Sequence, residues 1–199
     1  DLQLSARAMI TNRKPWALAA ALALGMIVGR VEAQEILKQW TITASTSITW
    51  IEDLDGDGER DLLIADALYD SPSAINAGRI QLISGASGSL IRQHIGPSRD
   101  YALLGGVNLG DTNGDGKQDY GALSAFPALT FIYSGVDGTE LLRRNGGVYS
   151  MITLGDVDGD SRAEFAFGAS AAAEVYQGGT TAPRLVIPAP PASLGFRFG

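Results

Sequence analysis

An acidic nonapeptide of one pattern occurs three times in the chain, at 53–61, 111–119 and 156–164. The first copy reads Asp53-Leu-Asp-Gly-Asp-Gly-Glu-Arg-Asp61, with carboxylates at its first, third, fifth and ninth positions. Oxygen ligands at alternate positions, with glycine between them, suit a hard cation such as Ca²⁺ in a short loop. The pattern therefore predicts three calcium-binding loops, named here the first, second and third loop.

The same five positions supply the predicted ligands in each loop. The side chains at positions 1, 3, 5 and 9 and the main-chain carbonyl at position 7 would bind the ion, so the side chain at position 7 can be acidic or basic. The set is Asp53, Asp55, Asp57, Glu59 and Asp61; Asp111, Asn113, Asp115, Lys117 and Asp119; and Asp156, Asp158, Asp160, Arg162 and Glu164. We expect the third loop to bind most weakly, because Ser161 replaces the second glycine and a longer Glu164 ends the loop.

Solvated turns are the alternative to cation sites, since Asp, Asn and Gly dominate turns for local reasons. A single copy of a short motif would leave that alternative open, whereas three copies in one register favour the cation sites. The predicted ligand side chains at positions 1, 3, 5 and 9 also include half of the chain's 22 acidic residues, which would repel one another at short range without a cation.

Short apolar segments follow the loops in a repeated order, and their alternation and β-rich composition predict strands. A further segment precedes the second and the third loop, and Asp137-Gly138 signals a hairpin turn. The predicted strands are 61–67, 78–85, 89–95, 101–109, 119–125, 129–135, 139–144, 148–154, 164–170 and 173–178. We therefore expect an all-β fold of four-stranded antiparallel meanders, which at this repeat length are typical of β-propeller blades.

The predicted repeats span about 41–100, 101–146 and 147–194 within a region 34–199, and a further repeat would start at 195–199. Three repeats and a beginning predict a partial propeller, because closed propellers have about four to eight blades. The longer first repeat is explained by an insertion at 68–76, which we assign to a surface loop.

The chain resembles the FG-GAP repeats of integrin α-chain propellers and their bacterial relatives. The resemblance lies in Leu154-Gly-Asp-Val-Asp-Gly-Asp160 followed by Phe165-Ala-Phe-Gly-Ala169, and in Ala77-Gly-Arg-Ile-Gln-Leu-Ile-Ser-Gly-Ala86. It implies a β-propeller in which the nonapeptide between the first two strands of each blade holds calcium. Ile64-Ala-Asp-Ala67 departs from the family's Gly-Ala-Pro element, so no subfamily is assigned.

Residues 1–33 have the composition of an export signal. Asn12-Arg-Lys14 precedes an apolar run at 17–29, and Val31-Glu-Ala33 offers a cleavage site, with Met9 as a plausible start. A retained membrane anchor is the alternative. Both place the repeats outside the cytoplasm, as a secreted, periplasmic or cell-surface protein, where millimolar calcium can fill weak sites. The chain has no Cys, so metal and packing must replace disulfides.

The sequence does not predict an enzyme. His94 is the only histidine, and no serine stands in a Gly-x-Ser-x-Gly motif. With a formal net charge of −7 and no basic cluster, we expect no nucleic acid partner. The prediction is an exported calcium-binding propeller module that binds an unknown protein or glycan in adhesion or recognition.

Two other functions stay open. The repeats could be the non-catalytic propeller portion of a larger extracellular hydrolase. Ser134-Gly-Val-Asp-Gly-Thr-Glu-Leu-Leu142 also has a faint similarity to quinoprotein propellers, although the calcium loops argue against it. Large aromatic residues could line a ligand surface, but they more often fill sheet cores; they are Trp40, Trp50, Tyr69, Tyr101, Phe126 and Tyr149.

Overall fold

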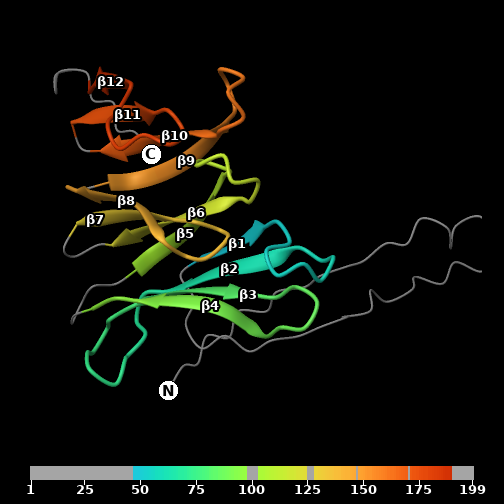
Figure 1. Ribbon diagram of the computed structural model, residues 1–199. Coiled ribbons are helices and arrows are strands. Elements are labelled where there is room, and N and C mark those ends of the chain that lie inside the picture. Colours follow the sequence, from blue (N-terminus) through green and yellow to red (C-terminus); the bar gives the residue numbers. More distant parts are fainter. Residues whose placement is uncertain (1–46, 98–102, 125–127, 147, 170, 190–199) are drawn as a thin grey trace, which may run out of the picture. The chain divides into compact units, whose positions relative to one another are not determined.

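A computed structural model describes residues 47–97, 103–124, 128–146, 148–169 and 171–189. Within these ranges the chain forms twelve β-strands and no helix (Figure 1), which confirms the all-β prediction. It follows that no helix in the described part could cross a membrane. The predicted signal region 1–33 and the predicted start of a further repeat at 195–199 lie outside the described residues.

The strands form three sheets of four, and within each sheet they pair antiparallel in chain order (Figure 1). This confirms the predicted four-stranded meanders. The first sheet holds β1 (Ser47–Ile51), β2 (Asp61–Asp66), β3 (Arg79–Ile83) and β4 (Leu90–Ile95); the second β5 (Leu103–Gly110), β6 (Asp119–Ser124), β7 (Leu129–Tyr133) and β8 (Glu140–Asn145); the third β9 (Val148–Gly155), β10 (Glu164–Ala169), β11 (Ala172–Tyr176) and β12 (Leu185–Pro188).

Strand β12 is the one strand of the third sheet that the sequence did not predict. It is an edge strand paired only with β11, and Pro188 ends it. An edge strand tolerates proline because one side of its backbone needs no ladder partner. Each acidic loop connects the first and second strands of its sheet, so the three loops occupy equivalent places in the fold.

Two apolar clusters join the sheets. In one, Leu63 and Leu82 of the first sheet pack with Tyr120 and Phe131 of the second. The sheets approach closely at Gly106, where an added Cβ would lie 2.7 Å from the Leu63 side chain. A larger residue at this position would therefore push the two sheets apart.

The second cluster joins the second and third sheets. Leu109 and Ile132 of the second sheet pack with Met151, Phe165 and Phe167 of the third. Alternation along a strand sends neighbouring side chains to opposite faces, so Ala166, which stands between these phenylalanines, faces away from the second sheet.

The opposite face of the third sheet carries a cross-strand row of apolar residues: Ile152, Ala166, Val175 and Leu185. Ile152 is 54% exposed and Leu185 is 51% exposed, whereas Phe167 on the covered face is fully buried. One face of the third sheet is thus buried and the other is partly exposed, although both faces carry apolar residues.

The two faces should respond differently to truncation. Phe167→Ala is expected to lower the free energy of unfolding by about 3–5 kcal/mol, because it removes a buried ring from the core. The matched change Ile152→Ala lies on the exposed face of the same sheet and is expected to lower it by less than about 1 kcal/mol. Urea unfolding followed by circular dichroism measures both. Equal losses would mean that the Ile152 face is covered in solution.

Candidate metal sites

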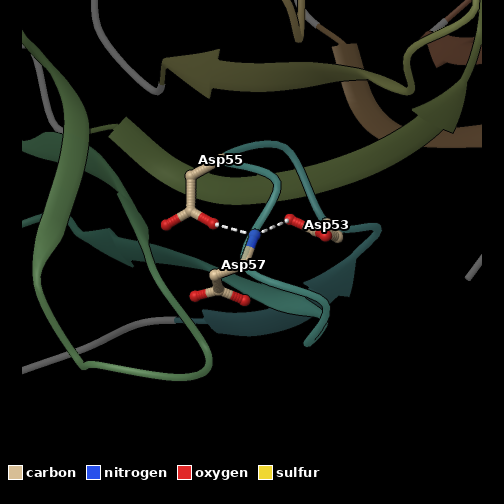
Figure 2. Close-up of side chains that lie close together, drawn as sticks. All are labelled: Asp53, Asp55 and Asp57. Atoms are coloured by element: carbon tan, nitrogen blue, oxygen red, sulfur yellow. Dashed lines mark hydrogen bonds between the residues drawn. The ribbon is translucent and has the colours of Figure 1, made fainter.

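The first loop coils around the carboxylate of Asp53. This carboxylate accepts the main-chain amides of Gly56 at 2.6 Å, Asp57 at 3.1 Å and Gly58 at 2.8 Å. Figure 2 shows the Asp57 amide shared between Asp53 and Asp55, whose Oδ1 lies 3.1 Å away. Gly56 and Gly58 have φ values of 83° and 90°, a region that glycine enters without a Cβ penalty.

The second and third loops repeat these bonds. Asp111 accepts the amides of positions 4, 5 and 6 at 2.7, 3.1 and 2.7 Å. Asp156 accepts the equivalent amides at 2.6, 3.1 and 3.0 Å. The position-7 residues Glu59, Lys117 and Arg162 also share a contact, since each donates its amide to the carboxylate at position 5 at 2.9 Å. One backbone design therefore serves three different sequences.

The carboxylates converge in two of the loops. Asp53, Asp55 and Asp57 each offer an oxygen within 4.8 Å of the others, and Asp156, Asp158 and Glu164 do the same. In the second loop Asn113 takes position 3 and donates to Asp115 Oδ2 at 2.7 Å. Groups of oxygen ligands such as these can hold a hard metal ion.

Two carboxylates of the first loop, those of Asp53 and Asp57, are held in their charged form. The amide of Gly58 is the main cause that lowers the pKa of Asp53. The hydroxyl of Ser84 does the same for the pKa of Asp57, which accepts its hydrogen bond at 2.7 Å. Both groups are therefore anionic at neutral pH, as a metal ligand must be.

The ninth position anchors the loops to their sheets. Asp61 is fully buried and accepts the amides of Leu54 at 2.8 Å and Gly85 at 3.1 Å. Asp119 accepts the amides of Thr112 at 2.9 Å and Gly135 at 3.0 Å. Burial raises the pKa of both carboxyls because it penalises the charged form. Each of these two carboxylates thus joins the start of its loop to the turn after the third strand.

Glu164 differs from both. Its Oε2 accepts the amide of Val157 at 2.8 Å, but its Oε1 is buried and has no hydrogen-bond partner. Glu164 as a whole is 1% exposed and belongs to the converging group with Asp156 and Asp158. A buried carboxylate oxygen without a partner costs free energy, and a cation bound by this group would supply the partner. The donors of the third loop therefore fit a metal ion.

The sequence interpretation missed one residue in each sheet that contacts the carboxylates of its loop. Ser84 donates to Asp57, Ser134 donates to Asp115 at 3.3 Å, and Gln177 donates to Asp158 and Asp160 at 3.2 Å. All three precede the glycine that follows the third strand. The repeated Ser-Gly pair was the available signal, although Gln177 breaks the pattern in the third sheet.

His94 is part of the packing between the first and second sheets. Its ring stacks on Tyr133 at 3.8 Å between centroids, and its Nε2 lies 2.8 Å from the Tyr120 hydroxyl. Burial lowers the pKa of His94 to about 4, and the charge of Arg92 acts in the same direction. The imidazole is therefore neutral at physiological pH and is engaged by aromatic neighbours.

The aromatic residues considered as ligand contacts fall into different settings. Trp50 is 43% exposed and Tyr149 is 75% exposed, so the expectation that such residues fill sheet cores is wrong for these two. Tyr69 packs against the Arg79 guanidinium, 4.0 Å from the ring centroid. The remaining three candidates, Trp40, Tyr101 and Phe126, lie outside the described residues.

No family model matches the chain, and no curated protein sequence matches it significantly.

Backbone strain distinguishes the third loop and gives a testable difference. Ser161 has φ 71° where the other loops have glycine, and a residue with a Cβ is disfavoured there by about 1–2 kcal/mol. We expect Ser161→Gly to raise the free energy of unfolding by about 0.5–1 kcal/mol, since glycine also gains entropy in the unfolded chain.

Gly116→Ala is the matched control at the same position of the second loop. Gly116 has φ 87°, and an added Cβ would meet no atom within 4 Å, so only backbone strain is introduced. We expect this change to lower the free energy of unfolding by about 1 kcal/mol or more. Urea unfolding of both variants in chelator measures the pair, and two shifts of the same sign would contradict the assignment of strain.

Proposed function

We propose that the chain is an exported calcium-binding repeat module of the FG-GAP type, whose three sheets are blades of a β-propeller. The observation that carries the proposal is the loop design: in every sheet, the first carboxylate of the nonapeptide accepts the amides of positions 4, 5 and 6. One such loop would be an acidic turn. Three such loops in equivalent places support the proposal that all of them bind the same kind of ion.

The donor chemistry favours calcium over other common cations. The converging groups contain only carboxylate oxygens, which suit hard cations. Calcium accepts six to eight oxygens in flexible geometry, whereas magnesium demands a near-ideal octahedron and retains several waters. A nine-residue loop that offers four side-chain oxygens and a carbonyl can meet the first demand more readily than the second.

The proposed role of the cation is structural. Ser84 and Gly85 connect the first loop to the end of β3 through Asp57 and Asp61. Charge neutralised in the loop would therefore strengthen contacts that continue into the sheet. Metal binding to the folded form alone adds its free energy to folding.

The surface role is recognition of a protein or glycan outside the cell. Trp50 and Tyr149 are large aromatic residues exposed on first strands, and exposed aromatic residues are favoured at binding surfaces. Because a fold does not fix a function, this part of the proposal rests on these side chains alone.

Calcium titration tests the metal assignment. Isothermal titration calorimetry of the chelator-stripped chain should show two or three saturable sites. At a calcium concentration about 100 times the dissociation constant, each site should add about 2.7 kcal/mol to the free energy of unfolding. Magnesium at the same concentration is the control and should add much less. A folded chain that binds no calcium at millimolar concentration would overturn the proposal.

Glu164→Gln gives a second prediction, in which the sign of the effect depends on the medium. With calcium, loss of a carboxylate ligand should lower the melting temperature, by roughly 2–4 °C for each 1 kcal/mol lost. In chelator, the same change should leave stability equal or higher, because it removes a buried unpartnered anionic oxygen.

Glu174→Gln is the control for a carboxylate with a purely structural partner. Glu174 accepts two hydrogen bonds from Arg144, at 2.8 and 2.6 Å. Its neutralisation should lower the melting temperature in both media. If Glu164→Gln also lowered it in both, Glu164 would be a structural residue and not a metal ligand.

A further inference from the structure

The end of the second loop contacts the start of the first loop. Lys117 Nζ donates to the main-chain carbonyl of Asp53 at 2.6 Å. Gln118 donates its amide to the Glu52 carboxylate, and its side-chain Oε1 accepts the Glu52 amide at 3.0 Å. Asn108 donates to the same Oε1 at 2.8 Å. Positions 7 and 8 of the second loop are thus bound to position 1 of the first loop and to the residue before it.

The third loop also contacts the second loop through its positions 7 and 8. The amide of Ala163, at position 8, donates to the main-chain carbonyl of Asp111, at position 1, at 2.6 Å. Arg162, at position 7, lies against Gly114, where an added Cβ would be 3.1 Å from its Nε. Both junctions therefore involve positions 7 and 8 of the later loop and the carbonyl at position 1 of the earlier loop, which accepts from position 7 in the first junction and from position 8 in the second.

The junctions involve the two loop positions, 1 and 7, that matter for the proposed cation site. Position 1 carries the carboxylate around which a loop coils, and position 7 carries the carbonyl that the proposed cation site would use. We propose that neighbouring loops are coupled, so that a cation bound in one loop raises the affinity of the adjacent loop. This inference rests on the proposed calcium function and adds to it a regulation of the same sites.

Electrostatics alone predicts the opposite sign. Two bound cations repel each other, and the Lys117 ammonium near Asp53 disfavours a cation in the first loop. Salt screens charges that are more than about 8 Å apart at physiological ionic strength. A cation that fixes one loop would also fix the junction residues of its neighbour, so the neighbour would lose less conformational freedom on binding its own cation. We therefore expect positive coupling at 150 mM salt. Positive coupling between the loops would therefore indicate an effect of the contacts, and negative coupling an effect of the charges.

The test measures the calcium affinity of the first loop with and without a functional second loop. The background variant Asp158→Ala disables the third loop, and Asp115→Ala then disables the second. Calorimetric titration of the full chain should give a first-loop dissociation constant about 10-fold weaker after Asp115→Ala, within the usual range of coupling between sites. Because coupling is reciprocal, Asp55→Ala should weaken the second loop by the same factor.

Two variants then identify the contact. Lys117→Met should remove most of the 10-fold factor, and Lys117→Arg, which keeps a donor, should retain it. Arg60→Met is the control for charge. Arg60 is exposed at position 8 of the first loop, and its substitution also removes one positive charge. Arg60→Met should leave the coupling factor unchanged. Circular dichroism in chelator checks that each variant is folded.

The failures are distinguishable. Independent or mutually weakened binding by the two loops would overturn the coupling and leave the calcium function intact. Equal effects of Lys117→Met and Arg60→Met on the coupling factor would also overturn it, since charge rather than contact would then be responsible. A chain without saturable calcium sites would overturn the proposed function, and the coupling with it.

Discussion

The geometry of all three loops depends on one interaction, the capture of three main-chain amides by the carboxylate at position 1. Asp53, Asp111 and Asp156 each accept the amides of positions 4, 5 and 6. These bonds force the backbone to coil, and coiling turns the later carboxylates toward the first. The need for left-handed backbone at two points explains the glycines, and Ser161 shows that the design tolerates a small residue there at a cost in strain.

The loops are continuous with the cores of the sheets through position 9. Asp61 and Asp119 are fully buried, and each joins a loop amide to the turn after the third strand. The next residues along the chain, Leu62 and Tyr120, are core residues that are 1% exposed. A cation bound by a loop would therefore act within a few bonds of the apolar core. This physical continuity is why a surface ion can be a structural element.

Most strands could be predicted from the sequence, because the loops mark the register of every repeat. Strands β1 and β12 were not predicted, and β12 is difficult to recognise because its residues are apolar, are exposed along the whole strand and end in Pro188. The exposure of Trp50 and Tyr149 could not be predicted either, since a large aromatic residue in a strand is normally expected to be buried. The contacts between neighbouring loops could not be predicted for another reason. Lys117 and Asp53 are 64 residues apart, and no local sequence pattern indicates that they meet.

The third sheet has the least support from packing. Leu82 and Ile132 stand at equivalent register positions in the first and second sheets, and each is 1% exposed. The matching residue of the third sheet, Val175, is only partly buried, and the row that contains it ends in Ile152 and Leu185, which are about half exposed. The low affinity predicted for its loop rests on Ser161 and on the longer Glu164. The strain at Ser161 exists before any cation binds and so would largely cancel in the binding free energy. The unpartnered oxygen of Glu164 would gain a partner if a cation were bound, which would stabilise the bound form by about 1–3 kcal/mol. This contribution would oppose the predicted ranking, and a cation would then have its largest structural effect in the sheet that packing supports least.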